Sequence, residues 1–167
     1  MNLGRIIFIP ASRPPHKNSH HLVGARHRLA MIRLAIRPFS QFQVSSIELR
    51  RRGFSYTIDT VRSMKRELGA HAALFFIIGE DNLAEVRTWK NYAELLEECQ
   101  FVAVRRKIID PKSIPVMIKK KIILLKTPVI PISSSQIRER IKRGKDIRRY
   151  VPFSVFQYLQ RYSLYKS

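Results

Sequence analysis

Leu74-Phe75-Phe76-Ile77-Ile78-Gly79-Glu80-Asp81 decides the fold, because an apolar run stops abruptly at a glycine and two acids. The run has the length and composition of a buried strand. A loop, a short helix near residues 82–86, Trp89 and a second helix over about residues 92–99 follow, and then a second apolar run, Phe101–Val104. In an open parallel sheet, ligands bind beyond the carboxyl ends of the strands. The sequence therefore predicts a binding site near Gly79, Asp81 and Trp89.

The alternation of strand and helix continues on both sides of this stretch. Short apolar runs predict further strands over residues 5–9, 42–45 and 122–125, with 47–49 as another candidate. Apolar positions at helical spacing predict helices over residues 25–36 and 58–68, one from Ser133 to Arg143, and a last one starting at Pro152. We therefore expect a doubly wound, Rossmann-like α/β fold, with a mostly parallel sheet and helices on both faces. The 167 residues make one domain, with a small helical portion over about residues 133–167.

The composition points to a cytoplasmic protein. Cys99 is the only cysteine, so an internal disulfide is excluded, and no spacing of cysteines and histidines predicts a metal site. No apolar run approaches the roughly 18 residues of a membrane span, and the first residues do not form a signal peptide. We expect no membrane partner, whereas a homo-oligomer is left open.

The net charge of +20, from 32 Lys and Arg against 12 Asp and Glu, is the strongest global signal. Such a charge attracts polyanions but does not specify a fold. The basic residues are spread along the chain, with clusters at 50–52, 119–121 and 138–149. A solvated basic surface is favoured over a nucleic-acid groove, because surface aromatics are not interleaved with the basic residues and no nucleic-acid motif is present.

Ser133-Ser134-Ser135-Gln136 fits a capping box, in which the Ser133 hydroxyl bonds the third helical N–H and Gln136 reaches back. Arg138 lies about one and a half turns further along this helix. Free N–H groups, the helix dipole and a guanidinium would together bind a phosphate. On the residues alone, simple capping is the favoured alternative.

Four other positions are open to two interpretations each. Thr57 lies near a helix start that could hold a small carboxylate, or it could be part of a cap. Asp81 could bind ribose hydroxyls or cap the next helix, and Trp89 could stack on a heterocycle or pack in the core. His16 and Lys17 could meet phosphates, in a loop that two prolines keep out of regular structure.

These signals coincide with a family. The chain resembles bacterial nicotinate-nucleotide adenylyltransferases over essentially all its 167 residues. The motifs that carry the resemblance, in order, are Pro14-Pro15-His16-Lys17, His27-Arg28-Leu29, Glu48-Leu49-Arg50-Arg51, Ser55-Tyr56-Thr57-Ile58-Asp59-Thr60, Phe75-Phe76-Ile77-Ile78-Gly79-Glu80-Asp81, Thr88-Trp89 and Ile132-Ser133-Ser134-Ser135-Gln136-Ile137-Arg138.

The resemblance implies transfer of AMP from ATP to nicotinate mononucleotide, which gives deamido-NAD and pyrophosphate, with Mg²⁺ accompanying ATP. It also implies roles for individual residues. Trp89 would stack on the pyridine ring, and groups around Tyr56, Thr57 and Lys90 would bind its carboxylate. The residues that would bind ATP are Gly79, Asp81, Ser133, Ser134, Ser135 and Arg138. The catalytic residues would be His16 and Lys17, which would face phosphates, together with Arg138. The family often has His or Tyr where this chain has Lys90.

One element of the family pattern is absent. The Gly-rich turn and His-x-Gly-His segment that open the family's sequences are not found in this chain. We therefore expect a shortened chain lacking the first βα element, on the order of 30 residues. Its loss would leave two unpaired strand edges in the middle of the sheet, with weak stability and weak or absent catalysis.

Two rival functions stay open. One is a related nucleotidyltransferase that uses another acceptor, such as nicotinamide mononucleotide or phosphopantetheine. The other is a non-catalytic basic module that binds RNA, for which the net charge is the only support.

Overall fold

The computed structural model describes residues 3–13, 22–69, 71–105, 114, 116–125, 127–129 and 132–166. The chain forms two compact units. The terminal unit comprises Met1–Ser55 and Ile132–Ser167, and the central unit comprises Tyr56–Pro131. Within the described ranges, no helix has both the length and the apolar character that crossing a membrane requires.

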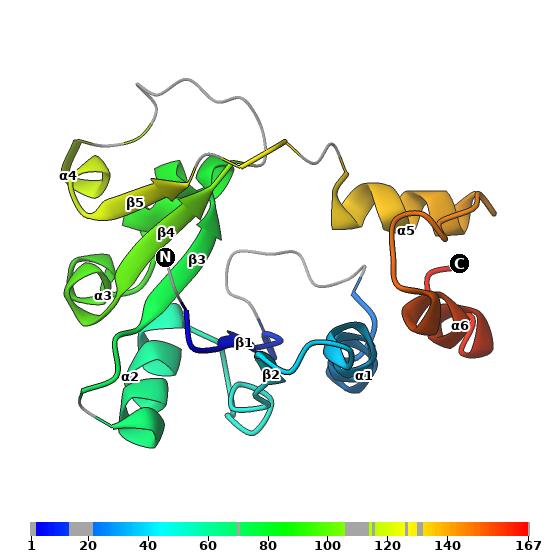
Figure 1. Cartoon of the computed structure of the whole chain (residues 1–167), viewed down its shortest axis with the longest axis horizontal. Helices are drawn as coiled ribbons and strands as arrows, with labels where there is room; N and C mark the ends of the chain where they lie inside the picture. Colours follow the sequence, from blue (N-terminus) through cyan, green and yellow to red (C-terminus); the bar gives the residue numbers. More distant parts are fainter. Residues whose placement is uncertain are drawn as a thin grey trace. The chain divides into compact units, whose positions relative to one another are not determined.

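The central unit is built on a parallel sheet of order β3-β4-β5 (Figure 1). Its elements, in chain order, are α2 (Thr57–Leu68), β3 (Phe75–Gly79), the 3-10 helix η2 (Glu80–Thr88), α3 (Tyr92–Glu98), β4 (Gln100–Val104), α4 (Val116–Lys119) and β5 (Ile122–Leu125). Phe76, Phe101 and Ile122 are paired across the three strands. This register aligns the carboxyl ends of β3 and β4, where the sequence predicts a site.

The core of the central unit lies against Phe101, which is fully buried. Leu83 and Leu95 are also fully buried, and they come from η2 and α3. The predicted apolar stripe of α2 is confirmed, because Ile58, Val61 and Met64 are buried at helical spacing. The predicted end of α2 is also confirmed. Gly69 has φ +93°, and its N–H donates to the carbonyl of Lys65.

The prediction that Leu74–Ile78 is a buried strand is wrong for alternate residues. The side chains of Phe75 and Ile77 are 37% and 44% exposed, whereas Ile78 is buried and Phe76 packs against the core. Successive side chains of a strand point to opposite faces of the sheet. Among the described strands, β3 pairs only with β4, so it is an edge strand rather than a central one.

The terminal unit holds a second parallel sheet and a second core. Its elements are β1 (Ile6–Phe8), α1 (Ala25–Ile36), β2 (Phe42–Val44), α5 (Ser134–Lys142) and α6 (Phe153–Arg161). Strand β1 pairs with β2, and the core contains Ile147, Val155, Leu159 and Leu164. A hydrogen bond of 2.9 Å between His27 Nδ1 and the Tyr158 hydroxyl joins α1 to α6.

Several sequence predictions are settled in this unit. The bounds of α1 are confirmed, and α5 ends next to Gly144 at φ +65°. The candidate strand over residues 47–49 is wrong, because hydrogen bonds from the N–H groups of Leu49 and Arg50 to Ser46 close a turn there. Pro152 is the N-cap of α6 rather than its first residue, since its ψ of 145° is not helical.

The predicted α/β class is confirmed, since every strand pair is parallel and helices alternate with the strands. The described strands form two sheets rather than one continuous sheet. Among the described strands, β1, β2, β3 and β5 each pair along one edge only, and β4 pairs along both.

We expect Phe101→Ala to lower the free energy of unfolding of the central unit by about 3–5 kcal/mol, because it leaves a cavity at the centre of the core. Ile77→Thr, at an exposed position of the same sheet, should cost less than about 1 kcal/mol. Urea denaturation followed by Trp89 fluorescence measures both. Equal losses for the two variants would show that Ile77 is covered in solution.

Candidate active site

The carboxyl end of β3 carries an acceptor atom without a partner. Helix η2 begins at Glu80, directly after the strand, and this places Asp81 in its first turn. The Oδ1 atom of Asp81 is buried, and the described residues offer it no hydrogen bond. A buried acceptor without a partner costs about 1–3 kcal/mol, more when it is charged. A ligand hydroxyl or a cation at this position would remove that cost.

Glu80 is a further acidic residue at this strand end that the sequence analysis did not single out. It is only 6% exposed, and its Oε2 atom lies 3.9 Å from Nε of Arg105. The parallel register explains the pair. Gly79 is aligned with Val104, so the residues that follow them are neighbours. The sequence signal for Glu80 is its position directly after an apolar strand. Its pairing with Arg105 could not be predicted, because it depends on the register of β3 and β4.

The start of α2 brings together three of the predicted substrate-binding residues. Tyr56 is the N-cap of α2 and Thr57 its first residue. The Lys90 ammonium lies 4.5 Å from the centre of the Tyr56 ring and 3.6 Å from Oδ2 of Asp59. In the described part of the chain, the side chain of the N-cap residue makes no capping hydrogen bond of its own. A helix start of this kind, next to an ammonium, favours an anion.

Trp89 immediately precedes Lys90 and packs against the core. Its ring centre lies 5.8 Å from that of Phe76 with the planes nearly perpendicular, and 6.5 Å from that of Phe101. The packing interpretation of Trp89 is therefore confirmed. The side chain is only half-buried, so the exposed part is available to the ring of a ligand.

The N-terminus of α5, in the terminal unit, has the predicted capping box. The Ser133 hydroxyl accepts a hydrogen bond of 3.2 Å from the N–H of Gln136, and the Gln136 side chain accepts one of 2.7 Å from the N–H of Ser133. The cap therefore occupies the hydroxyl of Ser133. The exposed hydroxyls of Ser134 and Ser135 do not take part in it.

Arg138 stands one turn after these serines. Its Nη2 atom donates a hydrogen bond of 2.9 Å to the Ser135 hydroxyl, and its guanidinium lies 6.0 Å from the centre of the Tyr165 ring. The first turn of α5 thus presents two hydroxyls, a guanidinium and the positive end of the helix dipole. This combination suits a phosphate, as the sequence predicts.

His16 and Lys17 lie outside the described residues, but the segment leading to them is described. Ser55 is buried, and its hydroxyl accepts hydrogen bonds from the N–H groups of Ser12 and Arg13 at 3.0 and 3.4 Å. Arg28 donates a hydrogen bond of 3.4 Å to the Ser12 carbonyl. The sequence analysis did not single out the role of Ser55 and Arg28 in holding this segment.

The chain matches a family model and several known proteins. A family model described as cytidylyltransferase-like matches residues 2–140. A probable nicotinate-nucleotide adenylyltransferase of Thermoanaerobacter sp. is 39% identical over 171 residues, which cover 98% of this chain and 81% of that protein. A protein with the same description from Methylacidiphilum infernorum is 40% identical over 168 residues, covering 99% of this chain and 79% of that protein.

Solved structures show the same fold at lower sequence identity. Plasmodium falciparum nicotinic acid mononucleotide adenylyltransferase complexed with NaAD aligns with a TM-score of 0.78 at 23% identity, covering 98% of this chain and 83% of that one. The same enzyme complexed with APC aligns with a TM-score of 0.73, also at 23% identity, with the same coverage.

Two serine variants test which hydroxyl caps α5. Ser133→Ala should lower the free energy of unfolding of the terminal unit by about 1 kcal/mol, because it removes the capping hydrogen bond. Ser134→Ala should change it by less than about 0.5 kcal/mol, because this hydroxyl is exposed. Urea denaturation followed by circular dichroism gives both values. A larger loss for Ser134→Ala than for Ser133→Ala would contradict the capping geometry.

Proposed function

The chain belongs to the cytidylyltransferase-like family and, within it, to the nicotinate-nucleotide adenylyltransferases. On this basis we propose how its residues transfer AMP from ATP to nicotinate mononucleotide. A phosphate oxygen of the mononucleotide attacks the α-phosphorus of ATP. The bond from that phosphorus to the β-bridging oxygen breaks, and pyrophosphate leaves as deamido-NAD forms. Such a transfer depends on positioning and charge stabilisation, and it needs no protein nucleophile.

The start of α2 and Lys90 would bind the carboxylate of the pyridine ring. The cluster of Tyr56, Lys90 and Asp59 at the first turn of α2 is the observation that carries this assignment. The cation and the helix dipole both favour an acid over its amide. Trp89, adjacent in sequence to Lys90, would supply the ring that stacks on the pyridine.

Ser133, Ser134, Ser135 and Arg138 would bind the phosphates of ATP. Their arrangement on one turn of α5 supports this role, with Ser133 acting through the cap. Gly79 would let the strand end approach the nucleotide closely, and the buried Oδ1 of Asp81 would accept a ribose hydroxyl. His16 and Lys17 would face the phosphates of the substrates. In this proposal the helices over about residues 133–167 complete the nucleotide site of a single domain.

Mg²⁺ would enter with ATP rather than occupy a site built by the protein. The described residues contain no group of three His, Cys, Asp or Glu that could hold a metal ion. Mg²⁺ commonly keeps several waters and binds largely through substrate phosphates, which is consistent with its entry together with ATP. When bound, the ion neutralises charge on the phosphates, while Arg138 supplies a fixed positive charge.

Discrimination between acid and amide tests the proposed acceptor. We expect nicotinate mononucleotide to quench the fluorescence of Trp89, the only tryptophan, with a Kd at least about tenfold below that of nicotinamide mononucleotide. The expected ratio corresponds to about 1.4 kcal/mol from the ammonium and the helix start. Equal Kd values for the two mononucleotides would support a related transferase with another acceptor and would contradict our assignment of the carboxylate site.

The contribution of Lys90 is measured in the same titration. Lys90→Met should weaken binding of nicotinate mononucleotide about tenfold and leave binding of the amide unchanged. Lys119→Met, which removes an exposed ammonium elsewhere in the central unit, is the matched control and should change neither.

Arg138→Gln tests the phosphate site. We expect kcat/KM for ATP to fall at least about tenfold, because the guanidinium next to the serines is lost. Arg161→Gln is a close control, since Arg161 also lies over a tyrosine ring, 5.7 Å from the centre of Tyr162. Steady-state pyrophosphate release gives both values. An equal fall for the two variants would mean that Arg138 acts through general charge alone.

A further inference from the structure

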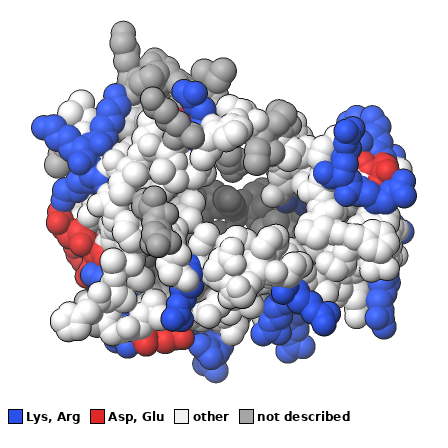
Figure 2. Space-filling view, viewed as in Figure 1, with Lys and Arg blue, Asp and Glu red and all other residues white. Residues whose placement is uncertain are grey.

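The net charge of the protein is divided very unequally between the two units. The terminal unit has 19 Lys and Arg against three Asp and Glu, a net charge of +16, whereas the central unit has 13 against nine, a net charge of +4. On the face drawn in Figure 2, blue Lys and Arg far outnumber red Asp and Glu. The excess positive charge therefore belongs to the unit that contains α1, α5 and α6.

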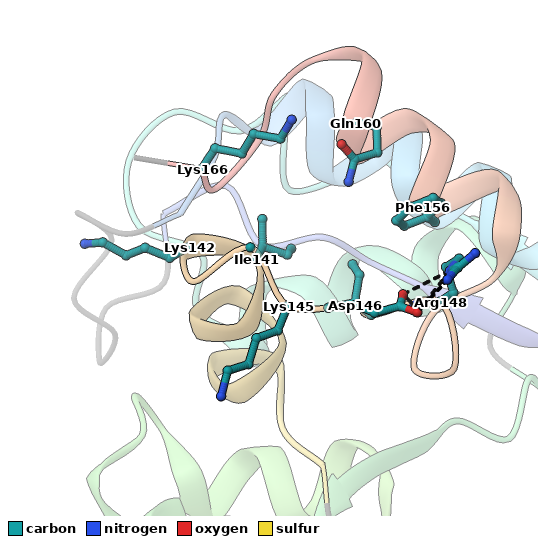
Figure 3. A pocket seen from close by; sticks show the side chains of 10 residues that line it. Ile141, Lys142, Lys145, Asp146, Arg148, Phe156, Gln160 and Lys166 are labelled. Carbon is teal, nitrogen blue, oxygen red and sulfur yellow. Dashed lines mark hydrogen bonds and ion pairs between the residues drawn. The ribbon is translucent and has the colours of Figure 1, made fainter.

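A cleft of about 530 Å³ opens in this unit, between the end of α5 and helix α6 (Figure 3). Its lining includes the side chains of Ile141, Lys142, Lys145, Phe156 and Lys166. The cleft lies at the C-terminal end of α5, about 12 Å along the helix axis from the serines at the N-terminus. It is therefore separate from the proposed phosphate site.

Three lysines of this cleft have unneutralised charge. The described residues provide no acidic partner for Lys142, Lys145 or Lys166, and all three are exposed. Arg148, by contrast, is held by Asp146, whose pKa it lowers to about 2 through two kinds of hydrogen bond. Figure 3 shows the three lysine side chains leaving the cleft in different directions. Their charges are thus spread along a surface rather than focused on one phosphate.

A pair of stacked aromatic rings on α6 reaches the same cleft through Phe156. Phe153 is 65% exposed, the largest value for an aromatic side chain in the described ranges. Its ring is stacked on that of Phe156, with a centre-to-centre distance of 6.2 Å and an interplanar angle of 28°. Phe156 in turn lines the cleft. Phe156 and the three lysines thus line the same cleft.

We propose that the surface formed by Lys142, Lys145, Lys166, Phe153 and Phe156, here termed the basic aromatic face, binds single-stranded nucleic acid in addition to the adenylyl transfer. The lysines contact successive phosphates, and an unpaired base stacks on Phe153. Single strands are bound elsewhere by the same combination of basic groove and aromatic platform, with little sequence preference. A single mononucleotide is the poorer fit, because the ammonium groups do not converge.

Fluorescence anisotropy with a labelled oligouridylate of about 12 nucleotides tests this face with the full chain. We expect binding that weakens steeply between about 50 and 200 mM salt. Lys142→Gln/Lys145→Gln should weaken binding about tenfold and reduce the slope of log K against log salt by about 1.4. The matched control, Lys119→Gln/Lys120→Gln, removes the same charge from exposed lysines of the central unit and should leave affinity within about twofold.

The platform is tested separately. Phe153→Ala should weaken binding at least about fivefold through lost stacking. Phe39→Ala removes another exposed phenylalanine of the terminal unit, which is 47% exposed, and should have no effect. Because Phe153 is 65% and Phe39 is 47% exposed, neither variant is expected to unfold the protein.

Four outcomes would overturn the proposal. These are absence of binding by the unaltered chain at low salt, equal losses in the two double-lysine variants, equal losses in the two phenylalanine variants, and displacement of the oligonucleotide by ATP with nicotinate mononucleotide. The last would place the oligonucleotide in the catalytic nucleotide site. Single-stranded DNA that binds as tightly as the oligouridylate would support the proposal, because the basic aromatic face contacts phosphates and the planes of bases.

Discussion

Parallel pairing of β3 with β4 is the constraint on which the central unit depends. The pairing aligns Gly79 with Val104, so both strands end at the same level and the residues beyond them meet. Glu80 consequently lies beside Arg105, and the chain turns at once into η2 with Asp81 in its first turn. Phe101, on the middle strand of the three, is fully buried in the core that this sheet supports.

In the proposed mechanism two helix starts, rather than a nucleophile, bind the substrates, and these two starts differ in their capping. The start of α5 is fully capped by Ser133 and Gln136, so its geometry is fixed without a ligand. At the start of α2 the ammonium of Lys90 lies beside the ring of the N-cap residue, Tyr56. A rigid start suits phosphates that must be held in line. A start with an ammonium beside it suits the smaller carboxylate.

Features that depend on neighbours in the sequence could be predicted, and features that depend on distant pairing could not. The α5 cap and the α2 stripe follow from spacing within one helix, and both are confirmed. The exposure of Ile77 could not be predicted, because an apolar run does not reveal whether both faces of a strand are covered. The contact of Lys90 with Tyr56 joins residues far apart in the chain, so the sequence predicted a shared role but no distance. The exposure of Phe153 likewise emerged only from the fold, since its position on α6 resembles a core position.

The central claim is that this chain joins AMP to the acid mononucleotide. Incubation with ATP labelled at the α-phosphorus, Mg²⁺ and nicotinate mononucleotide, followed by chromatographic separation of the products, measures it directly. The account predicts that label appears in deamido-NAD in equal amount to the pyrophosphate released. The account allows a slow transfer. It would be contradicted if the folded protein did not bind nicotinate mononucleotide, or if it formed as much dinucleotide from nicotinamide mononucleotide as from nicotinate mononucleotide.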